Sequence, residues 1–404
     1  MNLIGKFFCR VVQTGFRLAI PVLPYRDPRV LTATEQIPQV LQAQGKTSVL
    51  LVTDSFLRNS GLTAPLESAL HTAGISCTVY DQTRANPTVS NVEEALKLYR
   101  AGNCQAIIAF GGGSSMDCAK AVGARVVYPR RSLDKLKGIL RIRRRLPLLL
   151  AVPTTAGTGS ETTVTAVITD DNARHKYTIN SFPLIPRYAV LDPRVTYTLP
   201  PALTATTGMD ALTHAIEAYI GRSTTKDTRQ KALEAAKLIV KNIENAYTNG
   251  TDAVARAAML RAAYLAGAAF SKSYVGYVHA VAHSLGGQYN IPHGLANAVL
   301  LPLVLADYGT AVHKKLHEMA VAVGISDVTE PHCVGAEKMI ACIKELNQRM
   351  NIPRTLQGIR EEDIPTMARY AAKEANPLYP VPVLRNAREL ERYYRMAMEE
   401  HHGT

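Results

Sequence analysis

The chain has 404 residues, of which 47% are hydrophobic and 20% charged, a balance typical of a soluble globular protein with room for two domains. The formal net charge of +13 raises the question of an anionic partner. The six cysteines form no C-x-x-C pair and most lie in apolar runs, which excludes a disulfide scaffold and predicts reduced core residues in a cytoplasmic protein.

The first 28 residues are predicted to be an amphipathic helical extension. Apolar residues fill most of 1–20, and polar ones recur at steps of three or four, the spacing of a helix stripe. The segment is too short and too charged to span a bilayer, and no small-residue cleavage site follows it. We expect it to pack on the protein's own body. Contact with a membrane surface or a partner is the less favoured alternative.

Residues 29–198 alternate between buried-looking strands and helical patterns. This alternation predicts an α/β domain with a mostly parallel sheet. The lead-in at 30–44 is interpreted as a helix or a strand followed by a helix. The expected strands are 48–53, 77–80, 106–110, 148–152 and 188–191, with a hairpin of 163–169 and 176–179 around 170–172. The expected helices are 62–73, 92–101 and one that begins at about 113.

A basic segment at 125–145 carries much of the net charge. Its nine Lys and Arg residues and one acid, Asp134, give a local net charge of +8. With Tyr128 as its single aromatic residue, it lacks the interleaved stacking side chains of single-strand binders. We therefore interpret it as a solvated surface and do not expect a nucleic-acid partner.

Residues 199–404 show no strand pattern and are predicted to form an all-helical second domain. Ala and Leu recur there at helical spacing. The expected helices are 202–220, 226–249, 252–270, 294–323, 335–350 and 387–398.

One carboxylate and four imidazoles are concentrated in this helical half. Asp210 and His214 are four residues apart, as are His279 and His283, and His293 follows in a Pro-His-Gly turn. A spacing of four places both side chains of a pair on one helix face. One carboxylate with three imidazoles would bind Fe(II) or Zn(II). Five candidates exceed four ligands, so one His is left for proton transfer, and spacing alone does not say which.

Two glycine-rich loops follow two of the predicted strands, at 111–114 and 154–160. Bare glycines at a helix N-terminus let backbone N–H groups approach a pyrophosphate. The glycines at 111–114 do not follow the G-x-G-x-x-G fingerprint, and a tight turn that binds nothing would also use glycine. Asp54 ends another strand, where an acid favours NAD over NADP by binding the ribose; a simple helix cap is the alternative.

These motifs together resemble the iron-containing (group III) alcohol dehydrogenase family over roughly residues 30–400. The resemblance rests on four motifs in family order: Gly111-Gly-Gly-Ser-Ser-Met-Asp117, Pro153-Thr-Thr-Ala-Gly-Thr-Gly-Ser-Glu161, Gly208-Met-Asp-Ala-Leu-Thr-His-Ala-Ile-Glu217, and His279-Ala-Val-Ala-His283 through Pro292-His-Gly-Leu-Ala-Asn297.

The resemblance implies a nucleotide-binding α/β domain followed by an all-helical metal-binding domain, with the active site in the cleft between them. It assigns the four metal ligands to Asp210, His214, His279 and His293 and places His283 near the nicotinamide, as a group for proton transfer. It implies NAD rather than NADP, and Fe(II) with Zn(II) as an alternative. Its implied cofactor contacts are Asp54, Asn86, Gly111, Gly112, Gly113, Ser114, Ser115, Thr154, Thr155, Thr158, Val167, Lys176 and Leu203.

The activity implied is reversible hydride transfer between a primary alcohol or diol and NAD, with the aldehyde as the substrate in reverse. We also expect a homo-oligomer, such as a dimer, in the cytoplasm. An NAD-using sibling is the main alternative, either a hydroxyacid–oxoacid transhydrogenase or a dehydroquinate-synthase-like lyase. A non-catalytic scaffolding role is the other.

Overall fold

The computed structural model describes residues 1, 3–171 and 175–398 of the chain. The chain folds into two compact units. An α/β unit spans Pro24–Leu199, and a helical unit combines Met1–Leu23 with Pro200–Thr404.

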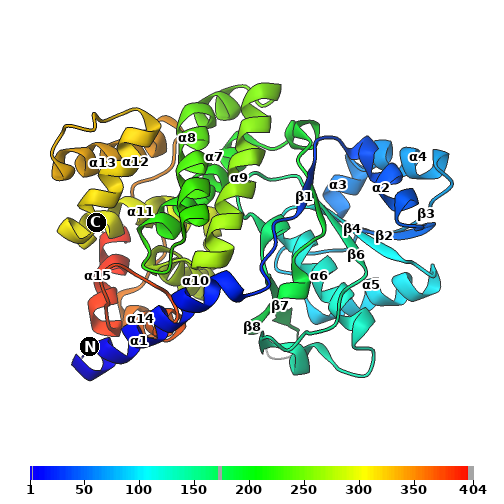
Figure 1. Ribbon diagram of the computed structural model, residues 1–404, viewed down its shortest axis with the longest axis horizontal. Coiled ribbons are helices and arrows are strands. Elements are labelled where there is room, and N and C mark those ends of the chain that lie inside the picture. The colour runs from blue at the N-terminus through cyan, green and yellow to red at the C-terminus, as the bar shows by residue number, and fades with distance from the viewer. Residues whose placement is uncertain (2, 172–174, 399–404) are drawn as a thin grey trace. The chain divides into compact units, whose positions relative to one another are not determined.

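The α/β unit contains a six-stranded sheet in which every neighbouring pair of strands is parallel (Figure 1). The strand order is β1-β9-β6-β4-β2-β3. Because β3 and β4 lie on opposite sides of β2, the order reverses beside β2, at the kind of crevice where open α/β sheets bind ligands. The strands are β1 (Arg29–Leu31), β2 (Ser48–Val52), β3 (Ser76–Tyr80), β4 (Ala106–Gly111), β6 (Leu148–Pro153) and β9 (Tyr188–Val190).

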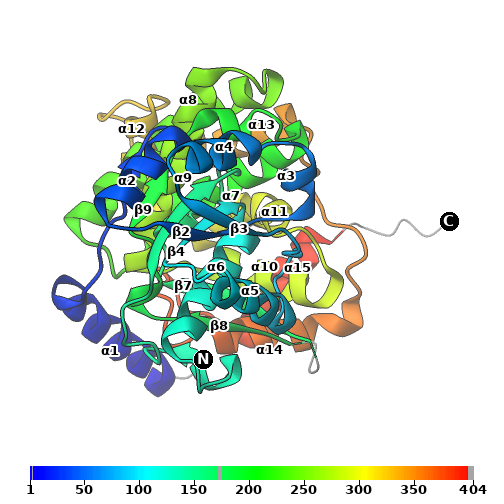
Figure 2. The ribbon, with the colours of Figure 1, turned by 90° about the vertical axis from the view of Figure 1, so that its right-hand side faces the viewer.

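Helices cover both faces of this sheet (Figures 1 and 2). Alternate residues of a strand point to opposite faces, so Leu50 and Val52 of β2 enter one hydrophobic cluster while Val49 and Leu51 enter the other. The first cluster includes residues of α5 (Val89–Ala101) and α6 (Gly113–Val127). The second includes residues of α2 (Ile37–Ala43), α3 (Ser55–Asn59) and α4 (Ala64–Thr72).

A smaller sheet completes the α/β unit. Its order is β5 (Gly138–Ile139), β8 (His175–Asn180) and β7 (Thr165–Asp170), and β7 and β8 form the predicted antiparallel hairpin. Asn172, in the predicted turn, lies outside the described residues. Within the basic segment, Arg125 pairs with Glu93 at 2.6 Å, and the guanidinium groups of Arg131 and Arg144 lie over the Tyr128 ring.

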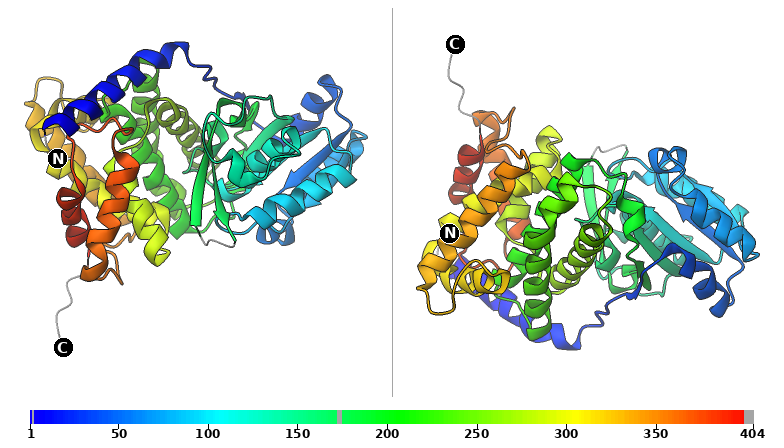
Figure 3. Two further views of the ribbon diagram at one scale, coloured as in Figure 1. Left: turned by 90° about the horizontal axis from the view of Figure 1, so that it is seen from below. Right: turned by 90° about the horizontal axis from the view of Figure 1, so that it is seen from above.

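The second unit is all-helical among its described residues, as predicted (Figure 3). The predicted helix 294–323 is in fact two helices, because Gly309 adopts a φ of 51° that ends the first one. The helix α14 was not predicted; it begins with Pro365 in its first turn, a residue more often interpreted as a break. The helices are α1 (Leu3–Ala19), α7 (Pro201–Ile220), α8 (Lys226–Thr248), α9 (Ala253–Ser273), α10 (Tyr277–Tyr289), α11 (His293–Tyr308), α12 (His313–Val323), α13 (His332–Arg349), α14 (Ile364–Ala375) and α15 (Ala387–Ala397).

Short 3-10 helices connect the larger elements of both units. They are Ile20–Val22, Thr34–Gln36, Leu133–Leu136, Ser160–Thr162, Phe182–Leu184, Pro193–Thr196, Gly309–Ala311 and Glu361–Asp363.

The core of the helical unit is built around α7. Almost every side chain from Thr204 to Ile220 is buried, and α8, α9 and α11 pack around the helix. A Cβ atom on Gly208 would lie 2.6 Å from Ile243 of α8 and 2.9 Å from Met259 of α9, so only glycine allows this approach.

Two stretches of the described chain, Ala253–Ser273 and His293–Ala311, are long and apolar enough to cross a membrane by length and composition alone. Most of the apolar window of each is buried inside the protein, as in the core helices of globular proteins.

Candidate metal centre and nucleotide-binding loops

The buried helix α7 positions the first two predicted metal ligands. Asp210 and His214 lie one turn apart, and only 2% and 4% of their surfaces are exposed. A buried carboxylate is costly unless charged or hydrogen-bonding groups surround it, so its partners identify the site.

Those partners come from α10 and α11. The Nε2 atom of His279 lies 3.6 Å from Asp210 Oδ1, and the Nε2 atom of His293 lies 3.4 Å from the same oxygen. One potential ligand atom from each of the three residues lies within 4.8 Å of the other two. The close approach of α11 to α7 requires Gly294, whose Cβ would lie 2.4 Å from the carbonyl oxygen of Thr206.

His214, the fourth predicted ligand, lies beside this group of three. Its ring stacks on His279 with centroids 4.4 Å apart and on Phe270 of α9 with centroids 4.0 Å apart. Its Nδ1 atom is buried without a hydrogen-bond partner among the described residues. The structure thus brings all four predicted ligands together, three of them with their ligand atoms mutually close.

The chemistry of these donors fits a divalent transition metal. The Nε2 atom of His279 is buried, faces a carboxylate at 3.6 Å, and has no hydrogen-bond partner in the described part of the chain. An unpartnered buried nitrogen is costly, and a metal ion would satisfy it. Imidazole nitrogens with a carboxylate oxygen suit iron or zinc.

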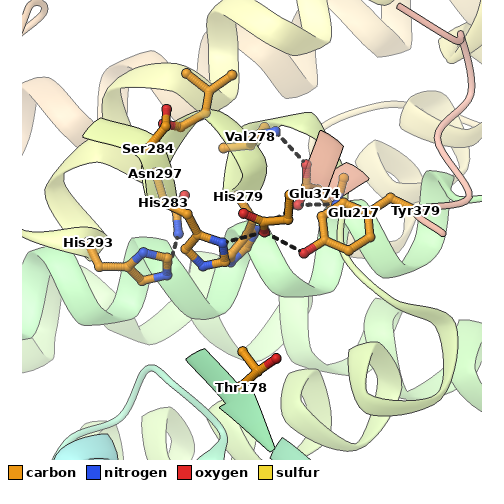
Figure 4. A network of polar contacts seen from close by, with 12 residues as sticks. Thr178, Glu217, Val278, His279, His283, Ser284, His293, Asn297, Glu374 and Tyr379 are labelled. Atoms are coloured by element: carbon orange, nitrogen blue, oxygen red, sulfur yellow. Dashed lines mark hydrogen bonds and ion pairs between the residues drawn. The ribbon is translucent and has the colours of Figure 1, made fainter. Parts of the chain in front are cut away.

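Glu217, one turn beyond His214 on α7, orients His279, and this role was not predicted from the sequence. Its Oε2 atom lies 2.6 Å from His279 Nδ1, and its two oxygens accept hydrogen bonds from the backbone N–H groups of Gly276 and Val278 (Figure 4). A carboxylate on Nδ1 leaves Nε2 to the metal. The spacing Asp210, His214, Glu217 on one helix face could have indicated it.

Asn297 belongs to the fourth sequence motif, but no role was predicted for it. Its Nδ2 atom donates to Asp210 Oδ1 at 2.7 Å. The same atom lies 3.0 Å from His293 Nε2 (Figure 4). Because Asn297 lies one turn after His293 on α11, a single buried amide links two predicted ligands from different helices.

His283 is more exposed than its neighbours, with 43% of its side chain accessible. Its Nδ1 atom lies 2.7 Å from Oε1 of Glu374 on α14, which also accepts from the Tyr379 hydroxyl at 2.6 Å (Figure 4). The His283 ring stacks on that of His293, with centroids 5.1 Å apart. No sequence pattern indicated Glu374 or Tyr379, which lie about 90 residues downstream.

The charges of the group shift the pKa values of its members in opposite directions. Burial of His279 alone would lower its pKa, but the nearby carboxylates of Asp210 and Glu217 outweigh it and raise the pKa to about 9. Burial lowers the pKa of His214 to about 3, against the attraction of Asp210. Burial would raise the pKa of Asp210, yet the surrounding histidines hold it well below its usual value.

In the α/β unit, the two glycine-rich loops face each other at the ends of β4 and β6. Gly111 has a φ of 151°, and Gly112 precedes the first turn of α6. A Cβ on Gly112 would lie 3.4 Å from Thr155, and one on Gly113 would lie 3.2 Å from Thr158. The bare backbone at this helix N-terminus fits a pyrophosphate.

Further predicted cofactor contacts gather beside these loops. The backbone N–H of Asn86 donates to Ser114 Oγ at 3.2 Å, and Lys176 Nζ donates to Asn86 Oδ1 at 2.9 Å. The backbone N–H of Val167 donates to Asp117 Oδ2 at 3.0 Å. Three separate segments therefore converge with the loop that starts α6. Thr154 donates its N–H to the Gly111 carbonyl at 3.1 Å, and Ser115 is buried.

Two predicted contacts lie apart from this network of hydrogen bonds. Asp54 caps α3, accepting from the N–H of Leu57 at 2.9 Å, so the helix-cap alternative describes its contact in this structure. Leu203 belongs to the helical unit, where it is exposed in the first turn of α7. Contact of either residue with a cofactor stays a prediction.

Comparison with known proteins identifies the family. Residues 31–193 match the family described as iron-containing alcohol dehydrogenase, and residues 204–398 match the Fe-containing alcohol dehydrogenase family, C-terminal. The 1,3-propanediol dehydrogenase of Klebsiella pneumoniae is 37% identical over 386 residues, which cover 95% of this chain and 98% of that protein.

Solved structures agree with this result. A 1,3-propanediol oxidoreductase superposes with a TM-score of 0.89 at 37% identity, covering 92% of this chain and 99% of that one. A sulfoacetaldehyde reductase from Bifidobacterium kashiwanohense, solved in complex with NAD+, superposes with a TM-score of 0.83 at 29% identity, covering 92% and 98%.

The chain belongs to the iron-containing alcohol dehydrogenase family. It is an oxidoreductase that acts on CH–OH groups. The predictions of family, fold class, activity and of iron and NAD as cofactors are thereby confirmed.

Proposed function

We propose that the chain oxidises a primary alcohol or a diol with NAD+ and reduces the aldehyde in the reverse direction. The observation that carries this proposal is the group of buried Asp210, buried His279 and half-buried His293, in which His279 Nε2 lacks a hydrogen-bond partner among the described residues. The names of the relatives support the substrate class, since they include dehydrogenases of 1,3-propanediol and of simple alcohols.

Asp210, His214, His279 and His293 hold the metal in this proposal. Iron bound to them would supply a Lewis acid for the oxygen of the reacting carbon. Glu217 fixes the ring of His279, and Asn297 fixes Asp210 and His293, so three helices present their donors in one arrangement before the metal binds. Phe270 packs flat on His214 and restricts the rotation of its ring.

The loops of the α/β unit bind NAD in this proposal. The backbone N–H groups of 111–115 approach the pyrophosphate at the N-terminus of α6, helped by the hydroxyls of Thr154, Thr155 and Thr158. Asn86, Val167 and Lys176 line the same end of the sheet. Asp54 selects NAD by repelling a 2′-phosphate, and Leu203 packs against the cofactor from the helical unit.

His283 exchanges the proton of the reaction with solvent. Its partial exposure allows that exchange, and the bond from Nδ1 to Glu374 leaves Nε2 as the free proton-carrying atom. The alcohol O–H loses its proton as the hydride leaves the carbinol carbon, so a nearby imidazole serves both directions of the reaction.

We further propose 29–198 as the dinucleotide-binding domain, 199–404 as the metal-binding domain and 1–28 as an extension of the chain. The enzyme works in the cytoplasm as a homo-oligomer, such as a dimer. Six cysteines without a disulfide support the reducing compartment.

The test uses protein stripped of metal and then given Fe(II) or Zn(II) without oxygen. NADH formation is followed by its absorbance with a panel of primary alcohols and diols. We expect turnover to return with metal, and with NAD+ rather than NADP+. Tight binding of NAD and metal without NADH accumulation from any alcohol would contradict the proposal.

A further inference from the structure

The N-terminal helix α1 turns an apolar face to solvent. Six of its large apolar side chains are exposed, and at 100° per residue they share roughly 140° of the helix circumference. Phe7 is 71% exposed and Leu3 85% exposed, values far from those of a packed helix face. These six residues form what we call the outer face of α1: Leu3, Ile4, Phe7, Phe8, Val11 and Leu18.

Side chains of α1 that do not belong to the outer face fix the helix to the helical unit by polar contacts. Gln13 is buried and donates to the carbonyl oxygens of Pro377 and Tyr379, and Arg10 donates to those of Val381 and Pro382. The predicted packing of α1 on the protein's own body is thus seen within the helical unit (Figure 3). Because these bonds set the rotation of the helix about its axis, the six apolar side chains of the outer face stay outside.

Positive charge borders this outer face. Lys6 and Arg17 project from one flank of α1, and Arg17 also lines a hollow of about 400 Å³. Three more basic side chains, Arg222, Arg229 and Lys315, line the same hollow. None of these four lining cations forms an ion pair with an acidic side chain of residues 1, 3–171 or 175–398.

The hollow and the outer face are continuous. Pro382 lines this cationic hollow and also lines a second one, of about 720 Å³, between 382–384 and the first two turns of α1. Lys315, which lines the cationic hollow, donates to three carbonyl oxygens, those of Tyr219, Ile220 and Gly221. The exposed apolar strip and the cluster of positive charges therefore border neighbouring hollows that meet at Pro382.

The crowding of these cations favours an anion. Burial, followed by the charge of Arg229, lowers the pKa of Lys315 to about 8; Glu318 opposes this, and Arg222 and Arg17 add to it. An anionic group in the hollow would relieve this repulsion. A second copy of the chain is repelled overall, since it carries the same net charge of +13.

We propose that α1 and the cationic hollow form a docking surface for a bilayer that contains anionic phospholipid. The outer face enters the boundary between headgroups and acyl chains, Lys6 and Arg17 stay at the level of the phosphates, and the hollow receives a headgroup phosphate. Docking through this surface places the enzyme at a membrane and does not change the reaction that it catalyses.

The test is sedimentation of the full-length enzyme with vesicles of phosphatidylcholine alone or mixed with phosphatidylserine. We expect the wild type to bind the mixed vesicles and not the neutral ones. The double variant F7S/F8S should bind about tenfold more weakly or worse for each phenylalanine removed. The matched control V254S/V328S, at two exposed valines of the helical unit, should bind like the wild type.

The charge is tested separately. R222Q/R229Q should weaken binding about fivefold for each arginine. The control K241Q/R354Q, at exposed cations that do not line the hollow, removes equal charge and should have a smaller effect. Alcohol oxidation should be equal in all variants, which separates failure of docking from failure of the catalytic proposal.

Three results would overturn the inference. The first is that the wild type does not bind the mixed vesicles. The second is that the variants and their controls lose vesicle binding equally. The third is that F7S/F8S, measured without vesicles, no longer forms oligomers but still binds vesicles like the wild type. The last would show that copies of the chain cover the outer face.

Discussion

The carboxylate of Glu217 lies 2.6 Å from Nδ1 of His279, and both side chains are almost completely buried. The same carboxylate accepts two backbone N–H groups at the start of α10, so it fixes both the ring and the helix that carries it. This relationship couples the fold of α10 to the geometry of the proposed metal site.

His279→Ala should abolish metal retention and turnover together. The variant removes a buried nitrogen that faces Asp210 at 3.6 Å, so the proposed metal site has one ligand fewer. Iron content after dialysis and alcohol-dependent NADH formation are the two measurements. Retained activity with metal still bound would refute the ligand assignment.

Glu217→Gln should weaken Fe(II) binding about 10- to 100-fold, the usual range when the partner of a histidine ligand is removed. The amide of Gln also turns one donor toward the N–H groups of Gly276 or Val278, where both oxygens now accept. Titration of the metal-free protein with Fe(II) measures the change. Glu244→Gln, at a half-buried carboxylate that pairs with Arg349, is the control and should bind as the wild type does.

Gly276→Ala should act on the site from a distance, because its Cβ would lie 2.6 Å from Glu217 Oε1. We expect a loss of about 1–3 kcal/mol in the free energy of unfolding, with weaker metal retention. Gly287→Ala, on the same helix with no atom near its Cβ, should be neutral or stabilising by up to about 1 kcal/mol. Equal denaturation midpoints for the two variants would contradict the close contact.

Gly111→Ala should lose NAD binding. The residue has a φ of 151°, and its Cβ would lie 2.4 Å from Ser115 Oγ at the start of α6. Gly138→Ala carries a similar backbone strain at φ 94° with open space around its Cβ, so it should lose stability but keep NAD affinity. Titration of NADH fluorescence separates the two effects. Normal affinity in Gly111→Ala would argue against the loop as the pyrophosphate site.

The pH dependence of stability should reveal Glu161, which burial holds at a pKa of about 7 although Lys120 nearby opposes the shift. A carboxyl whose pKa is raised in the folded state contributes its full stability below the unfolded value of 4.5 and loses it as the pH rises through about 7. The side chain of Glu161→Gln stays neutral, so the free energy of unfolding of this variant should rise relative to that of the wild type between pH 4.5 and about 7. Urea unfolding at several pH values measures the difference, with exposed Glu337→Gln as the control. A constant difference would mean that Glu161 does not titrate there.

The sequence alone determined the order and type of most elements. The parallel strands of the sheet are short apolar runs, which can be recognised from neighbouring residues alone. The placement of Asp210 and His214 on one helix face likewise follows from their spacing of four residues. The two glycine-rich loops were visible because only bare backbone tolerates their conformation and close contacts. Gly309 shows the limit of local pattern: one residue at positive φ divided a helix that periodicity had joined.

Tertiary structure decided which distant side chains meet. Asn297 contacts Asp210 across 87 residues, and Glu374 contacts His283 across 91, and no local period encodes such pairs. The sequence also did not determine the rotation of α1 about its axis, because its polar stripe could face water or the protein. The carbonyl oxygens of 377–382 decided the rotation, because they need hydrogen-bond donors and Gln13 supplies one. Helical spacing fixes which residues share a face, whereas only packing and hydrogen-bond satisfaction fix what that face touches.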